Sequence, residues 1–447
     1  MNIMFVSLGC DKNLVDSEMM IGMLSEHGYA FTDDETLADI IVVNTCCFIG
    51  DAKEESINTL LEMAEVKKNG RLKVLIAAGC LAQRYKEEIQ REIPEVDIII
   101  GTTAIDEIVK AVEDATGDLP VKVNYYRDIN AVPVHGKKRA VTTGGHFAYL
   151  KIAEGCDKHC TYCIIPKVRG NYRSVPMESL IEEATNLAEN GVKELILVAQ
   201  ETTLYGVDLY GKKSLHVLLR KLCKIPGLVW IRLLYCYPEE IDDELIKVMK
   251  EEPMICHYLD MPIQHAADGV LRRMGRRTNQ QQLRDIIEKL RNEIPDICLR
   301  TTLITGFPGE SQEDFEELYR FVNEMEFDRL GIFAYSREED TPAANMECQI
   351  EEEVKIARRD ELMELQQAIA FEKAEEKVGS IINVMVEGRA VEEDVYVART
   401  YMDAPNVDGY LFLRTSAQLL SGDFAKVLVT DSNEYDLIGE ITHEFTE

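Results

Sequence analysis

Three cysteines lie close together in the middle of the chain. Cys156, Cys160 and Cys163 are spaced C-x3-C-x2-C, directly after an apolar run at 147–152 that we expect to be a strand. Three thiolates on one tight loop can hold three irons of a cubane cluster, and the fourth iron then stays open for a ligand. Zinc prefers four ligands in two separated pairs, and His159 is placed awkwardly for that purpose. The spacing predicts a 4Fe–4S cluster; zinc and inert thiols are the alternatives.

A second set of cysteines is spread over the first part of the chain. Each member follows a short apolar run: Cys10 follows 4–8, Cys46 follows 40–43 and Cys80 follows 74–78. The carboxyl ends of parallel strands lie along one edge of a sheet, so three cysteines placed there can converge. Free cysteine is also a common buried residue, which makes coincidence the alternative. We predict a second, auxiliary cluster on these three residues.

Cys47 directly follows Cys46 and complicates this assignment. Neighbouring side chains of an extended strand face opposite sides, so only one of the two can point to the cluster. We assign the ligand to Cys46.

The elements around these cysteines predict an α/β protein of several domains. Apolar runs alternate with amphipathic stretches over 1–116, which is typical of a doubly wound parallel sheet. Residues 117–145, rich in glycine and proline, are interpreted as a linker. Six β/α units in 146–375 predict an open, partial barrel. Five short strands in 376–447 predict a small antiparallel barrel of the OB-like kind.

Composition limits the function. The chain has 447 residues, 12 cysteines and a formal net charge of -31. No apolar run approaches the length of a membrane span, and the apolar start is interpreted as a strand, not a signal peptide. We therefore expect a cytoplasmic protein without a membrane partner, where many cysteines favour metal chemistry over disulfides. The negative charge disfavours nucleic acid and favours basic partners.

The cysteine loop resembles that of the radical S-adenosylmethionine superfamily, including the aromatic Tyr162 before the third cysteine. The resemblance implies that the open iron binds S-adenosylmethionine and that reductive cleavage yields a 5′-deoxyadenosyl radical. A low-potential donor such as flavodoxin or ferredoxin is then expected. The segment Gly306-Phe307-Pro308-Gly309-Glu310 is implied to help bind S-adenosylmethionine, and its alternative is a plain strand-to-helix turn. Gln200 and Glu201 are implied to approach the ligand's amino group, and their alternative is a solvated strand end.

Both cysteine sets together resemble the methylthiotransferases over essentially the whole chain. The matching segments are Ser7-Leu8-Gly9-Cys10, Asn44-Thr45-Cys46, Gly79-Cys80 and the loop from Cys156 to Cys163. The resemblance implies an N-terminal cluster domain, a radical S-adenosylmethionine barrel and a C-terminal TRAM domain. It also implies that the six cysteines ligate two 4Fe–4S clusters. Cys47 departs from the family, which usually has glycine or another small residue there.

The methylthiotransferases divide by substrate, and three segments resemble one branch. Residues 9–18, 51–57 and 260–265 are similar to the branch that modifies the β-carbon of an aspartate of small-subunit ribosomal protein S-twelve. The transfer-RNA branch, which modifies an adenosine, typically has Gln-Met-Asn where Asp11-Lys12-Asn13 stands. From 376 to 447 there are 14 acids against 5 Lys and Arg. A barrel that binds RNA should be basic, because phosphate contacts dominate the affinity. An acidic barrel suits a basic ribosomal protein.

Three alternatives remain from the sequence. The first is the same chemistry on transfer RNA, the second a non-catalytic iron–sulfur carrier, and the third a zinc-stabilised binding protein. The acidic C-terminal region has its own alternative, namely that it contacts nothing charged. The basic segment 271–278 is interpreted as a solvated loop beside a helix, and contact with ribosomal RNA or a substrate carboxylate is its alternative.

Overall fold

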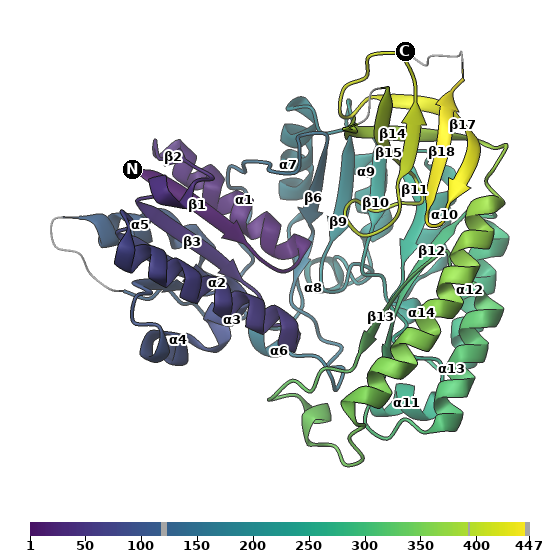
Figure 1. Cartoon of the computed structure of the whole chain (residues 1–447), viewed down its shortest axis with the longest axis horizontal. Helices are drawn as coiled ribbons and strands as arrows, with labels where there is room; N and C mark the ends of the chain where they lie inside the picture. Colours follow the sequence, from purple (N-terminus) through teal and green to yellow (C-terminus); the bar gives the residue numbers. More distant parts are fainter. Residues whose placement is uncertain (118–122, 392–393, 443–447) are drawn as a thin grey trace.

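The computed structural model describes residues 1–117, 123–391 and 394–442. They form an N-terminal parallel sheet, a larger central sheet and a small C-terminal barrel (Figure 1). Residues 118–122 of the predicted linker lie outside the described residues, as do 392–393 and 443–447. None of the helices in the described ranges has the length and apolarity needed to cross a membrane.

The N-terminal sheet has five parallel strands in the order β2-β1-β3-β4-β5. They are β1 Asn2–Ser7, β2 Ala30–Phe31, β3 Ile40–Thr45, β4 Val74–Ala78 and β5 Ile98–Ile100. β3 and β4 are buried throughout because helices cover both faces of the sheet. The sequence predicted four of these strands and missed β2, an exposed edge strand too short to carry a pattern.

Helices flank this sheet in the doubly wound manner that the alternating pattern predicted. One face is covered by α1 and α5 and the other by α2, α3 and α4. Their bounds are α1 Asp11–Glu26, α2 Gly50–Asn69, α3 Gly79–Arg84, α4 Lys86–Glu92 and α5 Ile108–Thr116, with short 3₁₀ turns η1 Glu35–Leu37 and η2 Ile105–Glu107.

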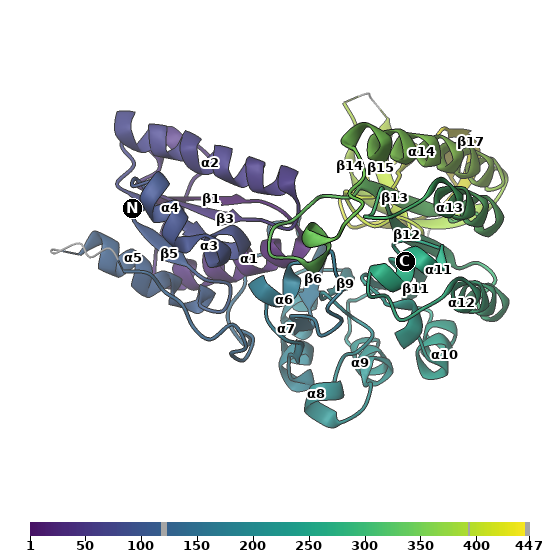
Figure 2. The ribbon, with the colours of Figure 1, turned by 90° about the horizontal axis from the view of Figure 1, so that it is seen from below.

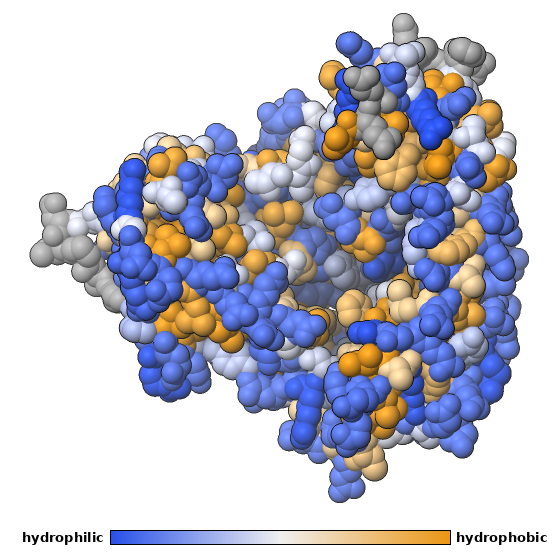
Figure 3. Space-filling model, viewed as in Figure 1, coloured by the Kyte–Doolittle hydropathy of each residue, from blue (hydrophilic) through white to orange (hydrophobic). Residues whose placement is uncertain are grey.

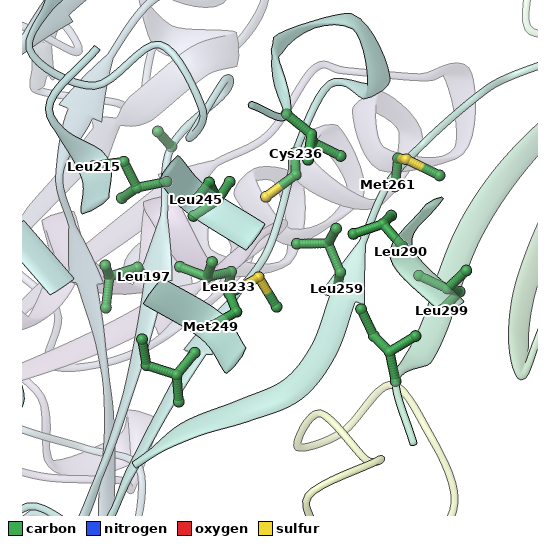
Figure 4. Packing of buried hydrophobic residues seen from close by; sticks show 14 of the residues in the cluster. Leu197, Leu215, Leu233, Cys236, Leu245, Met249, Leu259, Met261, Leu290 and Leu299 are labelled. Carbon is green, nitrogen blue, oxygen red and sulfur yellow. The ribbon is translucent and has the colours of Figure 1, made fainter. Parts of the chain in front are cut away.

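The central part is the predicted open barrel of six parallel strands, in the order β13-β12-β11-β10-β9-β6. The strands are β6 Phe147–Lys151, β9 Glu194–Val198, β10 Trp230–Leu233, β11 Ile255–Asp260, β12 Cys298–Thr305 and β13 Arg329–Ala334. A separate two-stranded ribbon pairs β7 Ala153–Glu154 with β8 Arg173–Ser174. Apolar side chains of alternate strand positions, such as Leu197, Leu233 and Leu259, pack outward against the helices (Figure 4).

Helices of the central part lie outside the barrel, and most of them supply the other half of this core, whereas α6 packs on the N-terminal part. They are α6 Ile165–Val168, α7 Met177–Glu189, α8 Val207–Tyr210, α9 Leu215–Leu222, α10 Asp243–Glu251, α11 Asp268–Arg273, α12 Gln280–Glu293, α13 Gln312–Met325 and α14 Glu352–Glu375, with 3₁₀ turns η3 Pro238–Glu240 and η4 Pro342–Asn345. Side-chain caps define the starts of α12 and α13, where Asn279 and Ser311 each form a capping box.

The C-terminal part is a closed five-stranded barrel in the order β14-β15-β16-β18-β17. The strands are β14 Ile381–Arg389, β15 Val395–Thr400, β16 Leu411–Arg414, β17 Phe424–Asn433 and β18 Asp436–Ile441. Four of the pairings are antiparallel as predicted, and β16 pairs with β18 in parallel. A ring with an odd number of strands cannot alternate direction throughout, so closure requires at least one parallel pair.

The C-terminal barrel closes the amino end of the central barrel. Glu194, the first residue of β9, accepts hydrogen bonds from Arg232 at 2.7 Å and from Arg399 at 2.6 Å, and all three side chains are fully buried. Trp230, the first residue of β10, packs its ring edge-to-face on Phe424 at 4.9 Å between centroids. The chain's single tryptophan therefore lies at this interface.

The N-terminal sheet lies beside the open edge of the central barrel, with α1 packed against β6 (Figures 1 and 2). Part of the predicted linker binds to the N-terminal part and so connects it to the central barrel. Arg139 pairs with Glu18 of α1, and the Glu18 carboxylate also accepts hydrogen bonds from Thr142. Loops that follow strands of both sheets are in contact here. The carboxyl ends of strands from both sheets therefore lie near this contact.

Candidate functional site

The three dispersed cysteines lie at the carboxyl ends of three adjacent strands. Cys10 precedes α1, Cys46 follows β3, and Cys80 is near the start of α3. Gly9 has a φ of +84°, and a Cβ on it would stand 2.8 Å from the Cys46 sulfur, so only glycine permits this approach of the two loops. Burial raises the pKa of Cys80, and the charges of Cys47, Cys46 and Cys10 raise it further, so these four thiols are electrostatic neighbours.

Asn13 connects the loops that carry these cysteines. Its buried amide nitrogen donates to the carbonyls of Leu8 and Thr45, both at 3.0 Å, which lie next to the Cys10 and Cys46 loops. Its amide oxygen lies 3.8 Å from the sulfur of Cys80. One buried side chain therefore fixes the relative positions of the three segments.

Cys46 and Cys47 have different surroundings. The backbone of Cys46 is held in both directions by the Ser56 hydroxyl, and its sulfur lies beside the Cys10 loop. Cys47 is fully buried in the apolar core under α2. Burial raises the pKa of Cys47 to about 11 against the opposing charge of Arg84. These surroundings favour Cys46 as the ligand, although this assignment stays a prediction.

We expect Cys46→Ala and Cys47→Ala to separate these two neighbours. Cys46→Ala removes one ligand of the auxiliary cluster, so iron bound after anaerobic reconstitution should fall by about half. Cys47→Ala leaves the ligands in place and should bind as much iron as the unmodified chain. Iron and sulfide analysis of both purified variants measures this difference. Retained iron in Cys46→Ala with loss in Cys47→Ala would reverse the assignment.

The second cysteine set lies on a loop closed by the β7–β8 ribbon. Gly155 adopts a φ of +80°, and a Cβ there would stand 2.0 Å from the carbonyl oxygen of Asn171, so the loop begins on a position reserved for glycine. Cys156 and Cys160 are buried and Cys163 is partly buried. Burial raises the pKa of Cys156 to about 12, with the charge of Cys160 adding to it.

Part of the basic segment 271–278 packs against this loop, whereas Arg272 and Arg277 are exposed as expected of a solvated loop. Thr161 donates its backbone N–H to Met274 and its hydroxyl to Arg273. Arg276 is buried, with its guanidinium 4.4 Å from the centroid of the Tyr237 ring. Charge runs usually face water, so no local pattern indicates that this arginine supports the cysteine loop.

An aromatic group lies between the cysteine loop and the carboxyl end of β12. Phe307 packs edge-to-face on Tyr162 and on Tyr335, with centroid distances of 6.5 and 5.3 Å. Phe307 itself is fully buried, and Pro308 follows it in the turn. These residues form an apolar cluster beside the cysteine loop.

The carboxylate of Glu310 hydrogen-bonds the backbone of the glycine-containing turn after β12. Gly306 has a φ of +70° and lies against Lys355, and Gly309 has a φ of +77°. Glu310 is buried and accepts the backbone N–H groups of Gly306 and Phe307 with one carboxylate oxygen. Its other oxygen accepts from Arg358 at 2.7 Å. Glu310 therefore holds the turn, and direct contact of this turn with S-adenosylmethionine stays a prediction.

Gln200 and Glu201 differ in how their polar atoms are used. Gln200 donates to Glu154 at 2.9 Å and accepts from the N–H of Gly155 at 2.8 Å. Glu201 is fully buried, and one of its oxygens accepts from Thr203. Its other oxygen has no hydrogen-bond partner among the described residues. Burial raises the pKa of Glu201 to about 7. The nearest cation to that oxygen is Lys158, whose Nζ lies 4.0 Å away. The oxygen therefore keeps an open hydrogen-bond position, which suits a ligand's ammonium group.

The donor sets fit clusters better than single metal ions. Within the described ranges, no three Cys, His, Asp or Glu side chains are grouped closely enough to hold one ion. A cubane binds its cysteines through different irons, which spreads the ligands more widely than a zinc site does. His159 is exposed, so it does not complete a site with its neighbouring cysteines.

The two cysteine sets belong to facing loops. Asp11, next to Cys10, accepts from the Tyr235 hydroxyl at 3.0 Å, and Tyr235 follows β10 of the central barrel. The N–H of Gly50 donates to Ser336, which follows β13. The molecular surface is hollowed between the N-terminal part and the barrel (Figure 3). Loops of the two parts are therefore in contact beside both cysteine sets, and one shared reaction site between the sets stays a prediction.

Two functional candidates were missed by sequence reasoning. Asn13 belongs to a segment that resembles the family but has no predicted role of its own, and Arg169 has no predicted role at all. Both act through contacts between segments far apart in the chain, which no local pattern reports.

Family models match three consecutive regions. Residues 2–101 match the uncharacterized protein family UPF0004, 150–322 match the Radical SAM superfamily, and 378–442 match the TRAM domain. Among solved structures, the radical S-adenosylmethionine methyltransferase TsrM from Kitasatospora setae has a TM-score of 0.54 at 14% identity, covering 76% of this chain and 73% of its own. The cobalamin-dependent S-adenosylmethionine radical enzyme OxsB has a TM-score of 0.50 at 14% identity, covering 82% and 56%. These similarities concern the fold.

Curated relatives match almost end to end. A protein of Lachnoclostridium phytofermentans is 63% identical over 98% of this chain and 99% of its own length. Proteins of Acetivibrio thermocellus and Clostridioides difficile are 50% and 49% identical, over 98% and 99% of this chain and of their own lengths. All three carry the name ribosomal protein uS12 methylthiotransferase RimO. With the radical S-adenosylmethionine core and the TRAM domain in place, the chain belongs to the RimO family of methylthiotransferases.

Proposed function

We propose that this protein methylthiolates the β-carbon of an aspartate of ribosomal protein uS12. The proposal rests on the name shared by relatives that match the full chain and on its radical S-adenosylmethionine core. The observation that supports it most directly is the facing arrangement of two cysteine sets at the carboxyl ends of two parallel sheets.

The cofactors are two 4Fe–4S clusters and S-adenosylmethionine. When bound, they supply a methylated sulfur and a 5′-deoxyadenosyl radical that removes a hydrogen atom from the substrate carbon. We assign Cys10, Cys46 and Cys80 to the auxiliary cluster and Cys156, Cys160 and Cys163 to the cluster that binds S-adenosylmethionine. Three thiols in each set leave one iron open for the ligand that reacts there.

The protein's own contribution is position and exclusion of water. Asn13 and Ser56 hold the auxiliary cysteines in place through the backbone beside them. Glu201 offers to the amino group of S-adenosylmethionine a carboxylate oxygen that has no hydrogen bond in the described residues. Tyr162, Phe307 and Tyr335 form an apolar wall that protects a reactive carbon radical. The described site therefore needs no protein nucleophile.

The partner and the location follow from the same proposal. A basic ribosomal protein suits a chain with a formal net charge of -31. A low-potential donor such as flavodoxin or ferredoxin is proposed to supply the electron, and the cytoplasm is proposed as the compartment because ribosomal proteins reside there.

A competition assay distinguishes the two substrate branches. Reconstituted enzyme, reductant and S-adenosylmethionine are given uS12 and bulk transfer RNA together under anaerobic conditions, and both are analysed by mass spectrometry. We expect a methylthio gain on one aspartate of uS12 and none on RNA. A gain on adenosine alone would overturn the proposed substrate while leaving the chemistry intact.

A further inference from the structure

Arg169 is a central-domain residue whose side chain ends inside the N-terminal site. It lies just after the 156–163 loop and α6, and its side chain is 2% exposed. Its Nε donates to the sulfur of Cys80 at 3.2 Å, and one Nη donates to the amide oxygen of Asn13. Cys80 thus receives a charge-assisted hydrogen bond from the other domain.

The remaining donors of Arg169 are fixed by a buried ion network. Its other Nη donates to Asp16 at 2.8 Å and to Glu154 at 3.1 Å. Lys151 pairs with the same two carboxylates. The four side chains are all nearly inaccessible, and two positive and two negative charges balance. The guanidinium therefore has little freedom to leave the Cys80 sulfur.

The network also fixes the other side of the site. Glu154 uses one oxygen for Arg169 and Lys151, and its second oxygen accepts from Gln200. Gln200 in turn accepts the N–H of Gly155, next to Cys156. The guanidinium is thereby held by groups of both domains, and its position depends on their docking.

We propose that Arg169 is a positioning residue for the auxiliary cluster: it orients the Cys80 sulfur, stabilises its negative charge and makes the central domain complete the N-terminal site. This inference rests on the proposed function, because it requires Cys80 to be a ligand. Hydrogen bonds and positive charge at ligand sulfurs stabilise a reduced, more negative cluster. Arg169 should therefore raise the reduction potential of the auxiliary cluster.

The test isolates that cluster in the full-length chain. Cys156, Cys160 and Cys163 are replaced together by alanine, so that only the auxiliary cluster can form. Into this background we place Arg169→Gln, Arg169→Lys and the double variant Arg169→Gln/Asp16→Asn. The double variant keeps the buried network charge-balanced and so guards against a simple failure to fold. Reconstituted samples are titrated anaerobically, and electron paramagnetic resonance gives the midpoint potential.

Two controls separate positioning from general damage. Lys167→Gln removes a positive charge two residues away whose side chain is 59% exposed, and it should leave the potential unchanged. Arg169→Gln is also placed in a chain with Cys10, Cys46 and Cys80 replaced by alanine. The potential of the other cluster should there shift less, because Arg169 reaches Cys156 only through Glu154, Gln200 and the N–H of Gly155, whereas it donates directly to Cys80.

We expect a more negative midpoint potential in Arg169→Gln and in the double variant, with a smaller shift in Arg169→Lys, which keeps the charge but not the planar donor geometry. An unchanged potential in the folded double variant would overturn the inference, as would an equal shift of both clusters. A background chain with Arg169 intact that forms no cluster would overturn the auxiliary ligand set itself, and the inference with it.

Discussion

Replacing Cys156, Cys160 and Cys163 together with alanine is expected to abolish 5′-deoxyadenosine formation while keeping about half of the bound iron. This set is assigned to the cluster that binds S-adenosylmethionine, and without it no electron reaches the sulfonium. The auxiliary cysteines belong to different loops of a different sheet and remain able to bind iron. Chromatography of the nucleoside product and iron analysis measure both effects.

The reciprocal replacement of Cys10, Cys46 and Cys80 should give the opposite pattern. 5′-Deoxyadenosine should still form, whereas uS12 should gain no methylthio group. The two triple variants are thus matched controls for one another. Loss of 5′-deoxyadenosine in both, with full iron retained in both, would contradict the separate roles assigned to the two sets.

Glu194→Ala is expected to destabilise the docking of the C-terminal barrel by about 3–5 kcal/mol. Removing this carboxylate leaves Arg232 and Arg399 buried with an uncompensated charge, which costs far more than an exposed ion pair contributes. Trp230 packs on Phe424 at the same interface, so its fluorescence reports on this contact directly. Urea unfolding followed by tryptophan emission should show a lower midpoint.

Glu293→Ala is the matched control for this prediction. Glu293 pairs with Lys250 at 3.0 Å, and both side chains are about half exposed. Its removal should cost less than about 1 kcal/mol. Equal effects of the two substitutions would mean that the buried contact does not hold the two barrels together.

Strand ends were the part of the site that the sequence could predict. Cys10, Cys46 and Cys80 follow apolar runs, and parallel strands bring such positions to one edge by topology alone. The structure confirms the parallel sheets and the order of α/β parts. It also adds β2, whose two residues carry no pattern, and a parallel pair, β16 with β18, which depends on barrel closure.

Contacts between distant segments were beyond sequence reasoning. Asn13 and Arg169 acquire their roles only when the N-terminal and central parts dock, since Arg169 reaches Cys80 across 89 positions of the chain. Neither spacing nor hydrophobic period reports such a contact. The buried position of Arg276 was likewise hidden, because a run of arginines is usually solvated.

The charge argument for the C-terminal region is also modified by the structure. Asp403 pairs with Arg329, and Asp408 accepts from the Tyr258 hydroxyl at 2.8 Å, both at the interface with the central barrel. Glu387 pairs with Arg399. Several acids counted in this region therefore bind the protein's own arginines and tyrosine, so its outer surface is less acidic than composition suggests.

Iron and sulfide analysis with Mössbauer spectroscopy of the reconstituted full-length protein tests the central claim most directly, because two three-cysteine sites are the basis of the proposed chemistry. We predict about eight irons and eight sulfides per chain, all in 4Fe–4S clusters. About four irons, or zinc without sulfide, would contradict the two-cluster account.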